Sequence, residues 1–326
     1  MEVPILFKPP FNSITLDNTK RGTFVTCPRK FYWHHQRGLV PKNGSTAIRY
    51  GATFHGALEG YYKVIKEKGW DAKDEAVTQG AILAKKVWDT QNKDQDFFTD
   101  YRTFEACMES FLQFLVHFQM DQSLLKVIDT EQVFELELFI DPDKDWWYSK
   151  YEYGLLPPII FTGRIDKVVN LSGMNWAVEY KTTGQPMDTQ VSRLNKLAQL
   201  KGYTWAADNL PKYDFQIAGA LVTVHRLYSG KLKDGGYGKL SIDFRRVPQI
   251  FTPADIVNWK HSFYYTAAQI HDCLIKDEWP QQDDQCYQYG QCTYARLCDQ
   301  NKIDLTEVNT DGFIYKPWDV MEEQVD

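Results

Sequence analysis

The residues with the clearest potential for chemistry lie in two neighbouring segments of the sequence. Residues 162–169 (TGRIDKVV) contain Asp166, and residues 176–183 (WAVEYKTT) contain Glu179 and Lys181. Both segments are predicted to be strands on either side of a turn at Ser172-Gly173, and side chains two apart in a strand point to the same face. Glu179 and Lys181 therefore share a face. If the two strands form a hairpin, Asp166 joins them, and two carboxylates and one ammonium can converge on one patch.

This set of groups suits the hydrolysis of a phosphodiester. Carboxylate oxygens are the ligands that the hard cations Mg²⁺ and Mn²⁺ prefer. A bound metal polarises the phosphoryl oxygen and lowers the pKa of its water. A neighbouring lysine can orient that water or offset the charge that develops on phosphorus oxygens. The spacing alone is equally compatible with a surface Glu–Lys pair and an isolated aspartate, which amphipathic strands often carry.

The hydrophobic pattern predicts the elements that would position these groups. Helical spacing predicts helices over about 53–68, 73–91 and 97–119. Alternation predicts a strand at 131–140. A hairpin is expected at 159–171 and 175–183 with a turn at Ser172-Gly173, and two further strands at 215–228 and 239–247. A helix is expected at about 189–209, and another begins with Thr252 as N-cap and Pro253 at its first position. The order of elements predicts an α/β (α+β) fold, a core sheet flanked by helices.

We expect a single domain over residues 1–303, followed by an acidic tail. Its parts are a helical N-terminal block (20–128), a catalytic core (130–250) and a C-terminal helix with a cysteine cluster (252–303). The tail, 304–326, carries seven acidic residues and one lysine, which accounts for the formal net charge of −6. The first residues contain two prolines and no long apolar run, which predicts neither a signal peptide nor a membrane anchor. A cytoplasmic location is therefore expected, where six cysteines are ligands or core residues rather than disulfides.

The front of the chain is basic, in contrast to the tail. Between Asn18 and Leu58 there is no Asp or Glu, but seven Lys and Arg residues occur, including Arg29, Lys30 and Arg37. Aromatic residues interleave with these cations: Phe24, Phe31, Tyr32, Trp33 and Tyr50. Such a strip can neutralise phosphates and stack unpaired bases. The alternative, that the aromatic residues pack the interior, stays open.

The hairpin resembles the core of the PD-(D/E)XK nuclease superfamily. The family motifs G-x-x-D and E-x-K match residues 163–166 and 179–181. The RecB-like branch, with CRISPR-associated RecB-like exonucleases and AddB-type subunits, adds a G-x-x-x-H helix, matched by residues 51–55. It also adds a Q-x-x-x-Y motif, matched by residues 199–203, and four cysteines split between the two ends of the chain. The match extends over residues 23–298.

The resemblance implies a restriction-endonuclease-like fold and a role for each matched residue. Asp166, Glu179 and Lys181 would be catalytic, and Mg²⁺ or Mn²⁺ would be bound by His55, Asp166, Glu179 and the Tyr180 carbonyl oxygen. Gln199 and Tyr203, one helical turn apart, would face the site and contact DNA or brace the Lys181 strand. By themselves, His55 is compatible with a core or surface histidine, and Gln199 and Tyr203 with an ordinary amphipathic helix.

The cysteines follow an unusual spacing. Cys27 stands near the front, and Cys286, Cys292 and Cys298 form a C-x5-C-x5-C series, unlike the C-x2-C pairs of most zinc sites. Three clustered cysteines with one remote partner resemble the 4Fe–4S site of RecB-like nucleases, in which four thiolates hold the cluster. Zinc and cysteines without a metal are the less favoured alternatives. Cys107 and Cys273 fall in predicted helices and are expected to be small core residues.

Together these features predict a metal-dependent DNA nuclease. By resemblance it is an exonuclease that acts on single-stranded DNA or free ends in recombination, repair or end processing. The sequence has no nucleotide-binding motif of the P-loop type, so a helicase or recombination partner would be a separate chain. The alternatives are a catalytically silent DNA-binding subunit of a recombination complex and a cluster-bearing redox protein. Retention of Asp166, Glu179 and Lys181 argues against the first, and the absence of a flavin or nucleotide motif argues against the second.

Overall fold

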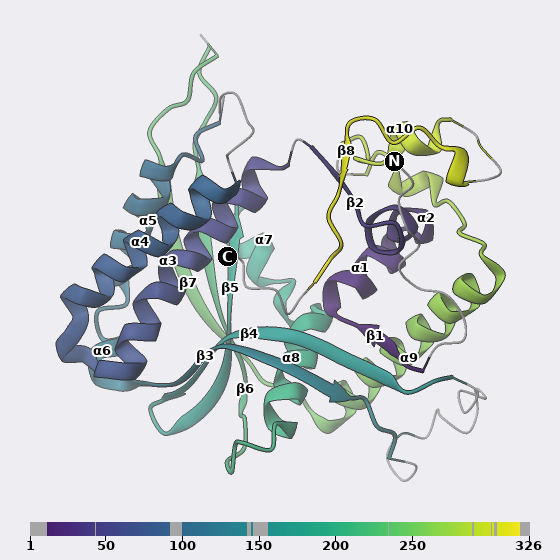
Figure 1. Cartoon of the computed structure of the whole chain (residues 1–326). Helices are drawn as coiled ribbons and strands as arrows, with labels where there is room; N and C mark the ends of the chain where they lie inside the picture. The colour runs from purple at the N-terminus through teal and green to yellow at the C-terminus, as the bar shows by residue number, and fades with distance from the viewer. Residues whose placement is uncertain are drawn as a thin grey trace. The chain divides into compact units, whose positions relative to one another are not determined.

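A computed structural model describes residues 12–42, 44–91, 100–141, 145, 156–233, 235–288, 290–300, 302 and 305–319. The chain divides into two compact units, each built from separate stretches of sequence (Figure 1). Unit 1 comprises residues 1–43, 135–163 and 257–321, and unit 2 comprises 44–134, 164–256 and 322–326. Of the predicted helical block, residues 20–43 belong to unit 1 and residues 44–128 to unit 2.

The predicted α/β fold with a core sheet flanked by helices is confirmed, and the structure shows that this sheet is mixed. Its strands run in the order β1 (Ile14–Leu16), β4 (Ile159–Leu171), β5 (Met174–Thr183), β6 (Gly219–Tyr228) and β7 (Ser241–Gln249), and β3 (Leu125–Glu137) pairs with β4. The predicted hairpin is confirmed: β4 and β5 pair antiparallel with Lys167 opposite Val178. Ser172 and Gly173 have φ of 52° and 87°, the left-handed conformation that a two-residue hairpin turn requires.

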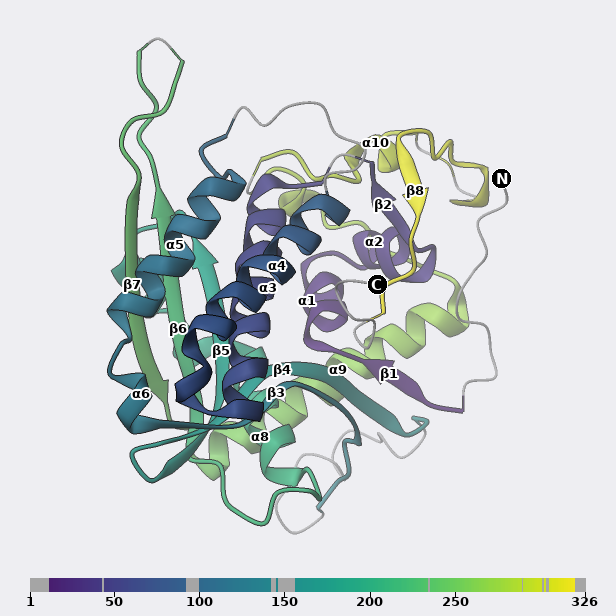
Figure 2. The same cartoon turned by 60° about the vertical axis from the view of Figure 1, so that its left-hand side comes forward.

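Helices cover both faces of the sheet in unit 2. On one face lie α3 (Thr46–Lys68), α4 (Lys73–Gln91) and α5 (Phe104–His117), side by side in Figure 2. They pack against Trp176, Val178 and Leu221, together with other residues of one core cluster. On the other face, α7 (Met187–Val191) and α8 (Ala198–Asn209) pack near Val222 and Val224. Alternation along β6 thus supplies both faces with apolar side chains.

The helix predicted at 189–209 is interrupted. It consists of α7, a 3-10 turn (Leu194–Lys196) and α8. Leu194 and Leu200 are both fully buried in the same core cluster. Six residues apart on an unbroken helix, they would point about 120° away from each other, so the break allows both to face the sheet. Other boundaries also move: α3 begins at Thr46, α5 at Phe104 and β3 at Leu125.

Unit 1 contains short elements from the two ends of the chain. At its front are α1 (Asn18–Thr26), α2 (Pro28–Phe31), a π-helix (Tyr32–Gln36) and β2 (Leu39–Pro41). From the C-terminal part come α9 (Pro253–Lys276, mostly in this unit), α10 (Ala295–Cys298) and β8 (Phe313–Tyr315). As predicted, Thr252 caps α9: its hydroxyl accepts from the Asp255 amide at 3.2 Å, and the Asp255 carboxylate accepts from the Thr252 amide at 2.9 Å.

The described part of the acidic tail is packed against unit 1. β8 pairs antiparallel with β2, with Val40 opposite Ile314. Beyond β8, the Trp318 indole N–H donates to Asp17 at 2.7 Å. Residues 305–319 therefore form an ordered strap in this unit. In the part of the chain that the structure describes, no helix is both long enough and apolar enough to cross a membrane.

One buried histidine makes stability depend on pH. His225 in β6 is 1% exposed, and its ring lies 4.3 Å from that of Phe54 and 4.9 Å from that of Phe244, between centroids. Neither ring nitrogen has a hydrogen-bond partner among the described residues. Burial lowers the pKa of His225 from 6.5 to about 3. Below pH 6.5 the unfolded chain therefore binds a proton at this site that the folded chain does not, and stability falls as the pH falls.

We predict that His225→Phe removes this contribution. Each pH unit between the two pKa values costs the parent about 1.4 kcal/mol at this site. Urea unfolding at about pH 8 and at about pH 5 should show a smaller loss of stability in the variant than in the parent. His117→Gln, which changes an exposed histidine of the same unit, is the control. An unchanged pH dependence in His225→Phe would contradict the prediction.

Candidate active site

The carboxylate of Asp166 is fixed where β4 and β5 separate. The regular pairing between these strands ends with Lys167 opposite Val178. One residue further along β4, Asp166 Oδ2 accepts a hydrogen bond of 2.8 Å from the backbone N–H of Tyr180 on β5. The side chain therefore takes a donor of the neighbouring strand. This bond locks the orientation of Asp166 relative to the segment that carries Glu179.

Lys181 lies between Glu179 and the first turn of α8. Its Nζ donates to Glu179 Oε1 at 2.5 Å and to Gln199 Oε1 at 2.5 Å. Glu179 is 4% exposed, and its second oxygen, Oε2, is buried without a hydrogen-bond partner among the described residues. Glu179 and Lys181 thus lie on the same face of β5, as their two-residue spacing predicts. Gln199, four residues before Tyr203, is brought to the same group by the break before α8.

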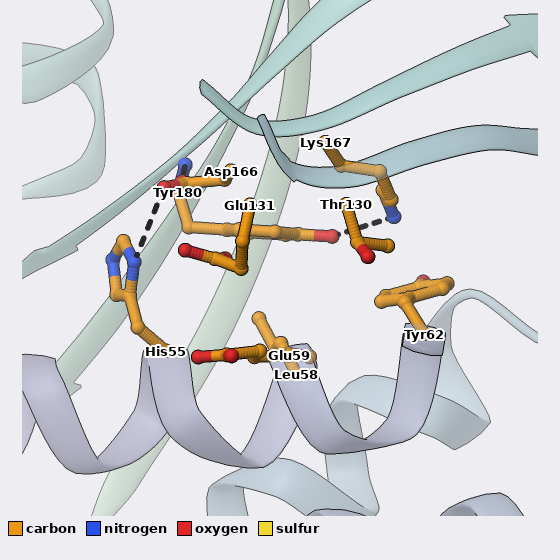
Figure 3. A pocket seen from close by; sticks show the side chains of 9 residues that line it. All are labelled: His55, Leu58, Glu59, Tyr62, Thr130, Glu131, Asp166, Lys167 and Tyr180. Atoms are coloured by element: carbon orange, nitrogen blue, oxygen red, sulfur yellow. Dashed lines mark hydrogen bonds and ion pairs between the residues drawn. The ribbon is translucent and has the colours of Figure 1, made fainter. Parts of the chain in front are cut away.

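Helix α3 places His55 next to the Asp166 carboxylate. Its Nδ1 lies 3.6 Å from Asp166 Oδ1. Both residues line a pocket between α3 and the strands, shown in Figure 3 with its other members: Leu58, Glu59, Tyr62, Thr130, Glu131, Lys167 and Tyr180. The residues from motifs more than 100 positions apart therefore meet at one pocket.

The pKa values in the site reflect burial and mutual contact. Burial raises the pKa of Glu179 to about 7, although the neighbouring Lys181 acts in the opposite direction. Burial would also raise the pKa of Asp166, but His55 and the Tyr180 N–H hold it below its usual value. For His55, burial would lower the pKa, yet the Asp166 carboxylate raises it to about 9. In the absence of a metal, the pocket therefore favours a protonated His55 beside an ionised Asp166.

Sequence reasoning did not single out Glu131. It lies in β3 at the edge of the pocket, with φ of 47°, an uncommon conformation for a residue other than glycine. Burial raises its pKa well above the usual value, and the charges of Asp166 and Glu59 act in the same direction. Arg164 Nη1 lies 4.0 Å from Glu131 Oε2. The sequence indicated Glu131 only as an acidic residue in a predicted strand, and Glu131 belongs to none of the motifs.

Lys167, next to Asp166, was also missed. It is 1% exposed; its Nζ donates to the Tyr180 hydroxyl at 2.7 Å and lies 3.1 Å from the centroid of the Tyr62 ring. Burial lowers its pKa well below the usual value. The contact holds Tyr180 by its side chain, while the Tyr180 backbone holds Asp166 (Figure 3). Lys167 therefore supports the geometry of the hairpin from within the same pocket.

The donor set is compatible with a hard divalent cation. Mg²⁺ is usually bound through one or two carboxylates and keeps several waters. Asp166 and the unpartnered Oε2 of Glu179 can supply these carboxylates. Within the described ranges, however, no three His, Cys, Asp or Glu side chains form a group placed to hold a metal ion. The participation of His55 and of the Tyr180 carbonyl stays a prediction.

The predicted DNA-binding residues at the front of the chain lie in unit 1. Arg37 is 5% exposed and donates to the Tyr32 hydroxyl at 3.1 Å, which favours a structural role. Arg29 is half-buried and donates to the Trp279 carbonyl at 2.6 Å. For Arg29 and Lys30, DNA binding stays a prediction. The aromatic residues of this segment are all buried: Phe24, Phe31, Tyr32, Trp33 and Tyr50. Of the two alternatives for them, interior packing is therefore the correct one.

The four cysteines of the predicted cluster all belong to unit 1. Cys27 is buried at the start of α2, and the Cys292 N–H donates to the Cys286 carbonyl at 2.7 Å. Burial raises the pKa of Cys298 to about 11, and the charges of Cys27 and Cys292 contribute. The thiols are thus close enough to affect one another, although the described residues contain no ready-made metal-binding group. As predicted, Cys107 is a buried residue of its helix.

Comparison with known proteins identifies the family. Residues 19–299 match the model of the PD-(D/E)XK nuclease superfamily. None of the curated proteins matches the sequence. A solved structure titled "Crystal structure of SSO0001" is 12% identical, with 88% of this chain and 87% of that chain covered and a TM-score of 0.32. Since the family model extends over most of the chain, the protein belongs to the PD-(D/E)XK nuclease superfamily.

Proposed function

We propose that the protein is a Mg²⁺- or Mn²⁺-dependent deoxyribonuclease with Asp166, Glu179 and Lys181 at its catalytic centre. Membership of the superfamily supports nuclease activity. The observation that carries the specific assignment is the position of the Lys181 ammonium, 2.5 Å from Glu179 Oε1, beside the unpartnered Oε2 of that carboxylate. A buried carboxylate oxygen without a partner is costly unless a cation or a proton satisfies it.

Each residue has a separate task in this proposal. Asp166 and Glu179 hold the cation, which when bound supplies Lewis acidity and a water of lowered pKa. Lys181 places a positive charge where negative charge develops on the phosphate. Gln199 orients Lys181 through its 2.5 Å hydrogen bond. Tyr203 is buried one turn later, 5.8 Å from Phe134 between ring centroids, which favours a role in holding α8 in place.

The finer features rest on the resemblance to RecB-like nucleases. We propose exonuclease action on single-stranded ends, with any helicase as a separate chain, and an iron–sulfur cluster held by Cys27, Cys286, Cys292 and Cys298. In support, these four cysteines lie in one unit and their thiols affect one another electrostatically. The cluster would join the two ends of the chain and has no part in hydrolysis.

Metal removal and return test the catalytic proposal. Purified protein in EDTA should leave end-labelled single-stranded DNA intact, and added Mg²⁺ or Mn²⁺ should start its degradation, because phosphate activation needs the cation. Ca²⁺ at the same concentration is the control for simple charge screening. Asp166→Ala should stay inactive with every cation. Cleavage in EDTA, or full cleavage by Asp166→Ala, would disprove the assignment.

A further inference from the structure

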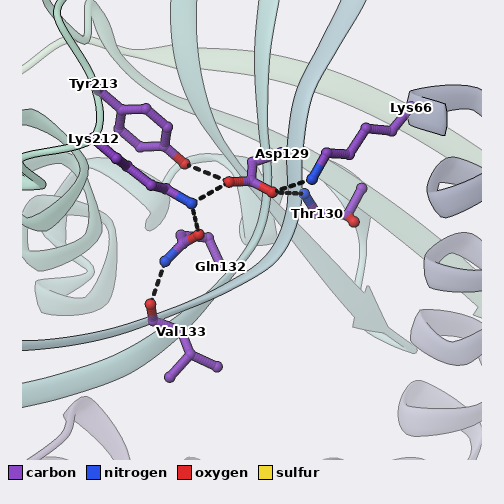
Figure 4. Close-up of polar contacts among 7 residues, drawn as sticks. All are labelled: Lys66, Asp129, Thr130, Gln132, Val133, Lys212 and Tyr213. Atoms are coloured by element: carbon purple, nitrogen blue, oxygen red, sulfur yellow. Dashed lines mark hydrogen bonds and ion pairs between the residues drawn. The ribbon is translucent and has the colours of Figure 1, made fainter.

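A second polar cluster lies beside the site, on two of the elements that build it. At its centre is Asp129 of β3 (Figure 4). Its carboxylate accepts from Lys66 Nζ of α3 at 2.7 Å, from Lys212 Nζ and from the Tyr213 hydroxyl at 3.2 Å. Lys212 also donates to Gln132. Two ammonium groups that approach one carboxylate lie close to each other, so the cluster concentrates positive charge on the surface.

The lysines of this cluster are accessible. The side chains of Lys66 and Lys212 are 39% and 44% exposed, whereas that of Asp129 is 13% exposed. With two ammonium groups and one carboxylate, the cluster carries a net positive charge. The two ammonium groups therefore lie at the surface with the Asp129 carboxylate beneath them, and the exposed carboxylate next to them in the sequence is Asp214.

An aromatic pair borders the two lysines. The rings of Tyr213 and Phe215 stack with centroids 5.2 Å apart and planes 24° apart, and both residues are half-buried. Lys212 Nζ also lies 5.1 Å from the centroid of the Tyr213 ring. Unlike the aromatic residues at the front of the chain, this pair therefore has accessible surface. Partly exposed rings next to accessible cations are the combination that binds single-stranded nucleic acid.

The cluster is close to the catalytic pocket. Asp129 and the pocket residue Glu131 are two apart on β3, a separation of about 7 Å along the strand. Lys66 lies on α3, as does His55. A DNA strand bound at the cluster can therefore reach the pocket over a short distance.

We propose that Lys66, Lys212, Tyr213 and Phe215 form a binding surface for single-stranded DNA that guides the strand into the pocket. The lysines bind backbone phosphates, and a base stacks on the Tyr213–Phe215 pair. Asp129 holds the two ammonium groups in place in the free protein and gives them up to phosphate in the complex. The inference rests on the proposed deoxyribonuclease function and assigns the residues that would bind its single-stranded substrate outside the pocket.

Binding in EDTA tests this surface separately from catalysis. The affinity of the full chain for a labelled single-stranded oligonucleotide and for a duplex of equal length is measured by fluorescence anisotropy over a range of salt concentrations. The salt slope is the change in the logarithm of the association constant with the logarithm of the salt concentration. For single-stranded DNA, its magnitude should fall by about 1.4 in Lys66→Gln/Lys212→Gln, because each of the two lost phosphate contacts contributes about 0.7. Tyr213→Leu should weaken single-strand binding on the order of tenfold through loss of stacking. The control is Lys68→Gln/Lys85→Gln, two exposed lysines paired with carboxylates in the same unit.

Asp129→Asn gives a prediction of the opposite sign. Removal of the competing carboxylate should strengthen single-strand binding and steepen its salt slope, a gain that misfolding cannot produce. An unchanged affinity in Asp129→Asn, an unchanged slope in the double variant, or equal losses for duplex and single strand would each overturn the proposal. If the parent still degrades DNA with Mg²⁺, the proposed function stands without this surface. If the parent is inert with every cation, the function fails whatever the binding data show.

Discussion

Replacing Lys181 with methionine is expected to reduce DNA cleavage by about two to three orders of magnitude, with little change in folding or DNA binding. Loss of one group that stabilises developing charge typically has an effect of this size. The Lys181 side chain is 25% exposed, and the unbranched, flexible methionine side chain can occupy the space of its buried stem. The loss of Lys181 also removes a positive charge that lowers the pKa of Glu179. The variant should therefore need more metal as well as turn over more slowly.

Single-turnover cleavage over a range of Mg²⁺ concentrations, with a thermal melt and a binding assay in EDTA, measures these effects. Lys201→Met is a matched control, since Lys201 is a partly exposed lysine of α8 that pairs with Asp255 at 3.5 Å. The control should cleave like the parent. If Lys181→Met cleaves DNA at the parent rate at saturating metal, the β4–β5 hairpin is not the catalytic centre. If it loses binding and cleavage together, Lys181 holds substrate rather than acting on the reaction.

Cys27→Ala is expected to give protein without iron and with a much lower melting temperature. Cys27 and Cys286 are 259 positions apart, so a cluster that joins them closes most of the chain into one loop. By analogy with a cross-link of this length, the constraint is worth about 5 kcal/mol. That is a large share of the stability of a typical domain. The parent should contain iron and absorb near about 400 nm, as thiolate–iron centres do.

Elemental analysis and a thermal melt of anaerobically purified protein test this proposal. Cys273→Ala, which changes a half-buried cysteine outside the group of four, is the control and should retain iron. Stoichiometric zinc without iron in the parent would favour the zinc alternative. A Cys27→Ala variant that melts like the parent would show that the cysteines do not clasp the two ends.

The sequence by itself determined the local parts of the site. The turn at Ser172-Gly173 predicted the hairpin, and the two-residue spacing predicted the shared face of Glu179 and Lys181, because strand geometry has a fixed period of two. The bounds of α4 and the cap of α9 at Thr252 also agree, since both depend on residues a few positions apart. The basic and aromatic composition of the front segment was equally evident. Composition does not reveal whether a ring is buried. The structure shows that the aromatic residues of this segment are packed in the interior.

The tertiary structure decided which distant residues meet. The 3.6 Å approach of His55 to Asp166 depends on how α3 lies against the sheet, which no local pattern encodes. The same holds for Glu131 at the pocket and for Lys66 and Lys212 on Asp129. Motif spacing constrains neighbours through backbone geometry, but contacts between elements follow from burial of whole faces, which depends on the entire chain. Local geometry thus gave the shared face of Glu179 and Lys181, and packing of helices on the sheet gave the residues that surround them.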